Sequence, residues 1–141
     1  MKTPSLDATR AFYRASPFMV DLGIEPTQVR EGRVHSELLL QSRHHQHTGQ
    51  VHAGVTNAMA DQAMGAAAQT LAPEGRWALT AELKTSHLRA AKGERLECEA
   101  WVVRGGRSLS FTEAEVYAVN GAQRTLVVKA SATMALVEAR A

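Results

Sequence analysis

The 141 residues are enough for one domain with a substantial core, and contents of 45% hydrophobic and 21% charged residues are typical of a globular protein. The net charge of +2 is small and spread along the chain, which argues against a nucleic-acid partner and is compatible with an anionic small molecule. The single cysteine, Cys98, excludes an internal disulfide and a thiolate metal cluster. Without a signal-peptide pattern or an apolar run of about 18 residues, we expect a cytoplasmic protein with no membrane partner.

The chain begins with a short predicted helix within residues 1–17. Thr3 is its expected N-cap, because a hydroxyl can accept a hydrogen bond from a free N–H of the first turn. Leu6 and Phe12 are expected on its packing side, with Tyr13 as a further candidate, and Pro17 is expected to end it.

A hairpin follows, with strands expected over 22–29 and 34–40 and a turn at Gly32. In the second strand apolar and polar residues alternate, as in a strand with one buried face. Residues 42–50 are polar and lack periodicity, so they predict a loop.

The longest predicted helix follows Gly54, because small and apolar residues recur at four-residue spacing and no proline appears before Pro73. A helix of this composition is usually buried. Its one charged side chain, Asp61, shares a face with Gly54, Ala58 and Gly65. A neighbouring segment can therefore approach that face closely.

Asp61 has two interpretations. A carboxylate in a buried helix is costly to ionise unless it is paired or used, so it is either a capped or salt-bridged structural acid or a functional group. The start of the helix, His52-Ala53-Gly54, favours the functional interpretation, since free N–H groups and the positive end of the helix dipole lie there. Such donors can polarise a carbonyl while the carboxylate, two turns deeper, serves as base or nucleophile.

Four extended runs follow the helix, and their separators include Asn120-Gly121, a strong hairpin signal. The expected strands are 77–88, 94–104, 108–119 and 123–137. The sequence thus predicts an α+β fold, one domain over residues 1–141, with an antiparallel β-sheet wrapped around the long central helix.

The start of the central helix also resembles a known motif. Its pattern is Gln46-x-x-Gly49-x-x-His52-Ala53-Gly54 and, nine residues after the histidine, Asp61. It is similar to the N-x-x-G-x-x-H-G-G-x6-D pattern of hotdog-fold acyl-CoA thioesterases, most closely the PaaI-type (phenylacetate-pathway) branch. Gln46 stands where that family usually has Asn, and Ala53 replaces the first Gly.

Two downstream segments extend the resemblance to about residues 22–137. Residues 80–89 are similar to the family's strand that ends in aromatic-Leu-Arg-Pro, although histidine and alanine replace the aromatic residue and the proline. Gly106-Arg107-Ser108 is similar to its G-[RK]-[ST] turn.

The resemblance implies an enzyme that hydrolyses an aryl- or medium-chain acyl-CoA to the carboxylic acid and free coenzyme A, without a further cofactor. It implies a homodimer, usually a dimer of dimers (a homotetramer), with subunits pairing their sheets and sites at the interface. The N–H of Ala53, helped by Gln46, would polarise the thioester carbonyl. Asp61 of the other subunit would activate water or attack directly, and Thr80 would position the water.

Substrate-binding candidates come from the same comparison. They are Gly54, Met59, Met64, Arg89, Arg107 and Ser108. Arg107 is the preferred cation for the coenzyme A phosphates, because a guanidinium binds phosphate bidentately; a solvated turn arginine is the alternative. Met59 and Met64 are expected to line an acyl pocket.

The histidines suggest a metal site only at first sight. His44, His45, His47 and His52 lack a cysteine or a carboxylate at ligand spacing, so we expect no metal. His44 and His45 are interpreted as solvated loop residues. His52 is interpreted as a helix-entry residue whose ring fixes the loop, with acid–base catalysis as the alternative.

Two other functions stay open. A non-catalytic acyl-CoA-binding module would keep Arg107 but would not need an acid at position 61. A hotdog enoyl-CoA hydratase or dehydratase would use His52 and Asp61 as its acid–base pair. The complete motif favours the thioesterase.

Overall fold

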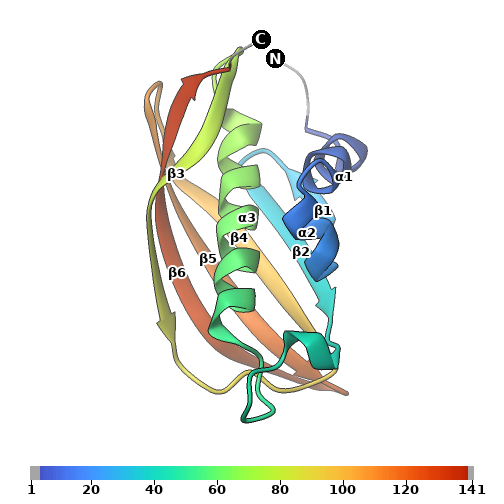
Figure 1. Cartoon of the computed structure of the whole chain (residues 1–141). Helices are drawn as coiled ribbons and strands as arrows, with labels where there is room; N and C mark the ends of the chain where they lie inside the picture. The colour runs from blue at the N-terminus through green and yellow to red at the C-terminus, as the bar shows by residue number, and fades with distance from the viewer. Residues whose placement is uncertain (1–3, 140–141) are drawn as a thin grey trace.

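The computed structural model of the chain describes residues 4–139 and shows one sheet that curves around a long helix (Figure 1). The helical elements are α1 (Leu6–Arg14), α2 (Pro17–Leu22), the 3-10 turn η1 (Ser42–His44) and α3 (Ala53–Leu71). The strands are β1 (Glu25–Arg30), β2 (Arg33–Leu39), β3 (Arg76–His87), β4 (Arg95–Gly105), β5 (Leu109–Asn120) and β6 (Gln123–Glu138).

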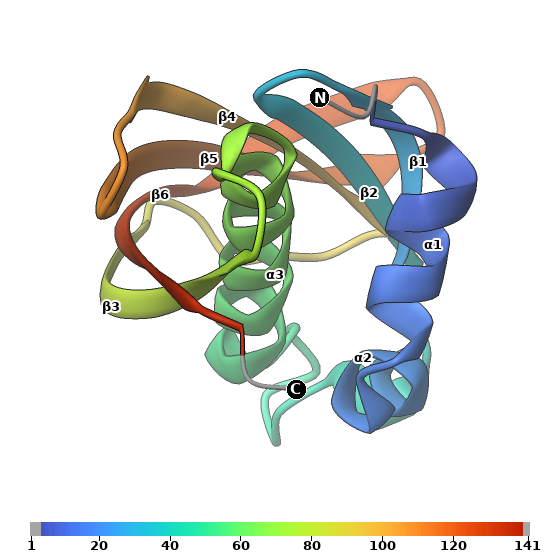
Figure 2. The same ribbon diagram turned by 90° about the horizontal axis from the view of Figure 1, so that it is seen from above.

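The sheet has six strands in the order β1-β2-β4-β5-β6-β3, and all neighbouring pairs are antiparallel. Viewed from above, it curls around α3, with α1 and α2 beside β1 and β2 (Figure 2). This is the α+β arrangement that the sequence predicts. None of the helices in residues 4–139 has the length and hydropathy needed to cross a lipid bilayer.

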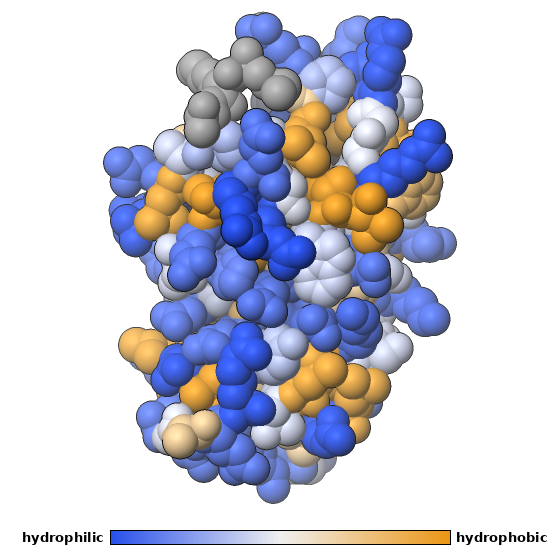
Figure 3. Space-filling model, turned by 180° about the vertical axis from the view of Figure 1, so that it is seen from behind, coloured by the Kyte–Doolittle hydropathy of each residue, from blue (hydrophilic) through white to orange (hydrophobic). Residues whose placement is uncertain are grey.

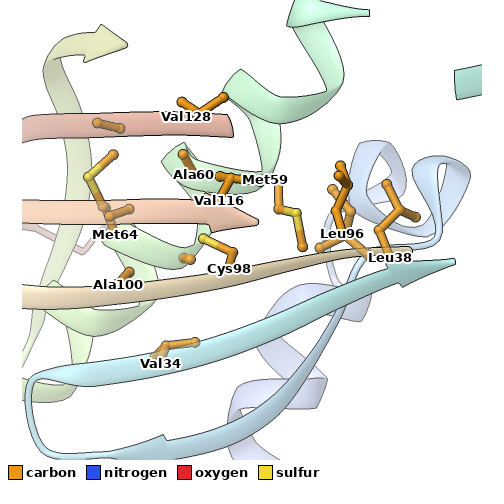
Figure 4. Close-up of a cluster of buried hydrophobic side chains, with 14 of the residues drawn as sticks. Val34, Leu38, Met59, Ala60, Met64, Leu96, Cys98, Ala100, Val116 and Val128 are labelled. Atoms are coloured by element: carbon orange, nitrogen blue, oxygen red, sulfur yellow. The ribbon is translucent and has the colours of Figure 1, made fainter. Parts of the chain in front are cut away.

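The core lies between α3 and the concave face of the sheet (Figure 4). Met59 and Met64 of α3 are fully buried there, beside Leu96 and Cys98 of β4. Burying one such large side chain contributes about 1.5–3 kcal/mol. Burial also raises the pKa of the Cys98 thiol to about 12, so this cysteine packs as a small neutral side chain.

The convex face of the sheet is a solvent-facing surface. Hydrophilic side chains cover most of it, with hydrophobic groups in between (Figure 3). Arg124 of β6 lies over the Tyr117 ring at 3.5 Å and donates from Nε to Glu97 Oε1 at 2.9 Å. This hydrogen bond lowers the pKa of the Glu97 carboxyl below its ordinary value.

The N-terminal segment corrects the sequence prediction in its details. Ser5 is the N-cap of α1 and accepts a hydrogen bond from the Ala8 N–H, whereas Thr3 lies outside the described residues. Pro17 begins a second helix, α2, because a proline fits the first turn, where an N–H has no intrahelical partner. Phe12 is 41% exposed, whereas Tyr13, the further candidate for the packing side, is buried together with Thr9.

Candidate functional site

The start of α3 presents the backbone N–H of Ala53 to solvent. His52 is the N-cap, and its ring Nδ1 accepts a hydrogen bond from the Gly54 N–H at 2.8 Å. Within residues 4–139, the N–H of Ala53 has no hydrogen-bond acceptor, and Ala53 is exposed. An N–H at the positive end of a 19-residue helix is a suitable donor to a ligand oxygen.

Gly54 has a structural reason for its size. A Cβ at this position would lie 3.0 Å from His52 Nδ1, closer than ordinary packing allows. A side chain here would therefore push against the ring that caps the helix.

A cavity of about 380 Å³ lies beside the Ala53 N–H. Gln46, Leu88 and Arg89 contribute to its lining, so two of the predicted site residues meet Ala53 there. Gln46 is half-buried, and its N–H donates to the Gln50 carbonyl at 2.7 Å, which holds the loop. The residues around the cavity thus include one with a free N–H, one with a side-chain amide and one with a guanidinium; Arg89 also donates from Nη1 to the Leu126 carbonyl at 3.3 Å. A larger groove of about 900 Å³ between α1 and the end of α3 contains none of these residues.

Asp61, about two turns into α3, contacts Thr80 of β3. The Thr80 hydroxyl donates to Asp61 Oδ1 at 2.6 Å. None of the ion pairs within residues 4–139 includes Asp61, so the structural interpretation as a salt-bridged acid is not supported. Asp61 is half-buried, because the sheet leaves open the face of α3 that also carries Gly54 and Ala58. This open face differs from the fully buried helix that the composition predicts.

The donor and the acid are too far apart to act together within one chain. Ala53 and Asp61 are eight residues apart, which is about 12 Å along a helix. A general base must lie within about 3 Å of the proton that it removes, directly or through one water. One chain therefore does not bring the free N–H and the carboxylate together at one point.

Arg107 and Ser108 lie at the opposite end of α3. They belong to the turn between β4 and β5, and a Cβ on neighbouring Gly105 would lie 3.9 Å from Leu71 Cβ. Leu71 is about 27 Å along the helix from Ala53. Both residues are exposed, but within one chain neither reaches the cavity that contains Arg89.

Met59 and Met64 do not line that cavity. Both are fully buried between α3 and the sheet, which differs from their predicted place in an acyl pocket. Leu88, at the end of β3, is the apolar side chain that does lie there, and it is half exposed.

His44 is a structural residue, contrary to the expected solvated loop position. It is 1% exposed, its Nδ1 accepts from the Gln41 N–H at 3.0 Å, and its Nε2 lies 2.7 Å from the Leu22 carbonyl. The neutral ring with a proton on Nε2 satisfies both contacts. Within residues 4–139, no group of three His, Cys, Asp or Glu side chains is arranged to hold a metal.

Sequence reasoning missed Gln69, which attaches the edge strand to the helix. Its Nε2 donates to the Arg76 carbonyl at 2.8 Å, and its Oε1 accepts from the Ala78 N–H at 2.9 Å. The side-chain amide of Gln69 thus donates to and accepts from the backbone of β3, as the backbone of a neighbouring strand would. The signal in the sequence was a lone amide in the alanine-rich second half of the helix.

The chain is similar to known thioesterases in sequence and structure. The family model described as Thioesterase superfamily matches residues 48–125, more than half of the 141 residues. A thioesterase family protein from Silicibacter pomeroyi is 30% identical, with a TM-score of 0.90 over 93% of this chain and 96% of that chain.

Other solved structures share the fold. Zebrafish thioesterase superfamily member 2 is 25% identical, with a TM-score of 0.83 over 95% of this chain and 99% of that chain. A thioesterase from Haemophilus influenzae is 20% identical, with a TM-score of 0.86 over 97% and 93%. A comparison with curated proteins finds no match. The chain adopts the hotdog fold and belongs to the thioesterase superfamily.

Proposed function

We propose that the protein is an acyl-CoA thioesterase that works as a homodimer and hydrolyses an aryl- or medium-chain acyl-CoA to the carboxylic acid and free coenzyme A. Membership of the thioesterase superfamily supports thioester hydrolysis. Two groups carry the proposal. Among residues 4–139, the N–H of Ala53 has no acceptor, and the Asp61 carboxylate has no ion-pair partner and accepts from Thr80.

In the proposed reaction, the Ala53 N–H stabilises the oxyanion that forms when the thioester carbonyl is attacked. One such donor contributes about 3–4 kcal/mol. Gln46 lines the same cavity, and its side-chain amide supplies a second donor. The helix dipole adds to both, since negative charge is favoured at a helix N-terminus.

Asp61 supplies the base or the nucleophile. The Thr80 hydroxyl occupies Oδ1, and Oδ2 has no hydrogen-bond partner within residues 4–139, so Oδ2 is the oxygen available for water. As a base, Asp61 takes a proton from water while the water oxygen bonds to the carbonyl carbon. The carbon–sulfur bond then breaks, and the proton passes to the thiolate of coenzyme A. In the alternative, Oδ2 itself attacks the carbonyl carbon, the carbon–sulfur bond breaks and the coenzyme A thiolate leaves. Water then hydrolyses the mixed anhydride, which releases the carboxylic acid, restores the Asp61 carboxylate and supplies the proton of the thiol.

The dimer is part of the proposal because one chain separates the two halves of the site by about 12 Å. A second copy in antiparallel orientation along α3 would bring its Asp61 to the Ala53 N–H of the first. The same orientation would bring its Arg107 from the far end of α3 toward the cavity, where Arg107 would bind the coenzyme A phosphates together with Arg89. Pairs of such dimers would form the tetramer.

The test is thiol release, measured with a thiol-reactive dye, from phenylacetyl-, benzoyl-, hexanoyl- and palmitoyl-CoA. Asp61→Ala and Asp61→Asn should each reduce turnover by about 10²–10⁴-fold without loss of folding. Asp21→Asn, an exposed acid on α2, is the matched control and should keep full activity. Near wild-type activity of Asp61→Asn would refute the role of the carboxylate.

The same experiment separates the alternatives. Coenzyme A binding without thiol release from any substrate would indicate a binding module. Hydration of an enoyl-CoA would indicate a hydratase, but His52 already uses Nδ1 to accept the Gly54 N–H. His52 is also nine residues from Asp61, about 13 Å along the helix, so the two do not form an acid–base pair within one chain.

A further inference from the structure

We propose that His44 is a positioning residue for thioester hydrolysis, because its buried ring holds the hairpin that carries both oxyanion donors. The hairpin consists of residues 44–52 and leads directly into α3, at the end of the molecule where that helix begins (Figure 1). His44 does not line the cavity beside Ala53, so it acts through the residues that it holds. The inference rests on the proposed function and adds to it a residue outside the cavity.

The two arms of the hairpin are paired with each other, which makes it one structural unit. The contacts between the arms are the antiparallel bridge of His45 with Val51, the bond from the Gln46 N–H to the Gln50 carbonyl at 2.7 Å, and the bond from the His52 N–H to the His44 carbonyl at 2.9 Å. Gln46 lies on the first arm, and Ala53 follows the second. A contact that fixes the base of the hairpin therefore fixes both donors.

The His44 ring attaches this base to helix α2. Its Nε2 lies 2.7 Å from the carbonyl of Leu22, the last residue of α2, and its Nδ1 accepts from the Gln41 N–H at 3.0 Å. The ring is buried, so water does not compete for either contact. Arg43 also donates to the Leu22 carbonyl, at 3.3 Å, but from an exposed side chain. The histidine therefore provides the shorter and better shielded contact.

The two arms are held in different ways. On the second arm Val51 is buried, and its N–H donates to the Ala91 carbonyl at 3.0 Å. On the first arm, residues 44–46, only His44 is buried. The position of Gln46 thus depends on the imidazole ring two residues before it.

The His44 backbone also reaches the start of α3. Its carbonyl accepts from the N–H of His52, the N-cap residue, and His52 Nδ1 in turn accepts from the Gly54 N–H. The Ala53 N–H lies between these two bonded residues, so its direction follows from theirs. An oxyanion donor must lie about 2.7–3.1 Å from its oxygen, and a misplacement of about 1 Å can cost about 10²-fold in rate. Loss of the anchor to α2 should therefore lower kcat while both donors remain present.

Two substitutions separate the two ring contacts. His44→Asn keeps an acceptor in the place of Nδ1, but its side chain is too short to reach the Leu22 carbonyl. His44→Gln keeps a donor in the place of Nε2, but leaves the Gln41 N–H without an acceptor. Each variant gives up one hydrogen bond and keeps the other, so both should fold with a Tm lowered by about 3–5 °C. A purely structural role predicts that the two variants behave alike.

Thiol release distinguishes them, measured on whichever of phenylacetyl-, benzoyl-, hexanoyl- and palmitoyl-CoA the wild type hydrolyses fastest. His44→Asn should reduce kcat about 10- to 100-fold and change KM by less than about threefold, because misplaced donors weaken transition-state stabilisation rather than substrate binding. His44→Gln keeps the anchor to α2 and should retain kcat within about threefold of the wild type. Equal kcat values for the two variants, or a loss confined to KM, would overturn the inference.

Amide hydrogen exchange tests the anchor without a substrate. The N–H groups of Gln46 and His52 are bonded across the hairpin, so their protection in His44→Asn should fall about tenfold or more below that in His44→Gln. The amides of strand β5, in the centre of the sheet, are the internal control and should exchange equally in both variants. Equal protection of the hairpin in the two variants would also overturn the inference.

The positioning role and the proposed activity fail separately. A wild type that releases no thiol from any of the four substrates would refute the activity, while the exchange measurement still decides whether His44 anchors the hairpin. A wild type that is active, with two variants of equal kcat, would refute the positioning role alone.

Discussion

Replacement of Gln69 by alanine should loosen the start of the edge strand by a measurable amount. The side chain makes two hydrogen bonds to β3, at 2.8 and 2.9 Å, from a half-buried position. Each such bond contributes about 1 kcal/mol net. Alanine has a higher helix propensity than glutamine, which offsets a few tenths of a kcal/mol of this loss in stability. We therefore expect Gln69→Ala to lower the free energy of unfolding by about 1–2 kcal/mol.

Urea denaturation at one fixed protein concentration measures this loss, which corresponds to a fall in Tm of about 3–6 °C. Gln69→Glu keeps an acceptor for the Ala78 N–H but places a carboxylate against the Arg76 carbonyl. It should therefore be destabilised at neutral pH and recover as the introduced carboxyl is protonated in acid. Gln62→Ala, on the same helix, is the matched control and should change stability by less than about 0.5 kcal/mol. A Gln69→Ala variant as stable as the Gln62→Ala control would refute the reasoning.

Three further substitutions test the site and the fold. Thr80→Val removes the donor to Asp61 and should reduce kcat about 10- to 100-fold, the equivalent of one hydrogen bond to a charged group, whereas Thr80→Ser should keep most activity. Arg124→Ala should lower the free energy of unfolding by about 0.5–1 kcal/mol at pH 7. Because Arg124 lowers the pKa of Glu97, the pair stabilises the fold at pH values above the ordinary carboxyl range. In urea titrations at decreasing pH, the stability difference between variant and wild type should therefore disappear as the pH falls through the lowered pKa. His44→Leu should lower unfolding stability by about 1–3 kcal/mol, because the Gln41 N–H loses its acceptor and the Leu22 carbonyl keeps only the contact with Arg43 Nη2 at 3.3 Å; EDTA should not change the wild-type curve.

The sequence predicted the sheet well because its signals are local. Alternating residues define the strands, and turns such as Asn120-Gly121 define their ends, so β3 to β6 begin and end within about two residues of the expected positions. The N-terminal segment was predicted less accurately. Ser5 and Thr3 are both possible caps of the first helix, and Ser16 caps a second helix that the sequence analysis did not separate from the first.

The candidate site was predictable where its residues are close in sequence. Gln46 and Ala53 meet at one cavity because a short loop leads directly into the helix. His44 and Gln69 could not be assigned, since their partners are set by the docking of α2 and by the register of β3. Met59 was misplaced for a related reason: helical periodicity groups side chains on a face without saying which face the sheet covers.

The features left incomplete in one chain lie together around the start of α3 and the free edge of β3. Within residues 4–139 they are the unpaired Ala53 N–H, the free Oδ2 of Asp61, the open helix face and the unpaired edge of β3. A free strand edge is an aggregation hazard, and natural proteins usually cover or charge it. Here the edge carries Glu82 and Lys84 on either side of Leu83, and charged side chains limit edge-to-edge aggregation. In the proposed dimer a second copy would complete these features, because its Asp61 would lie beside the Ala53 N–H and supply the base that one chain places about 12 Å away.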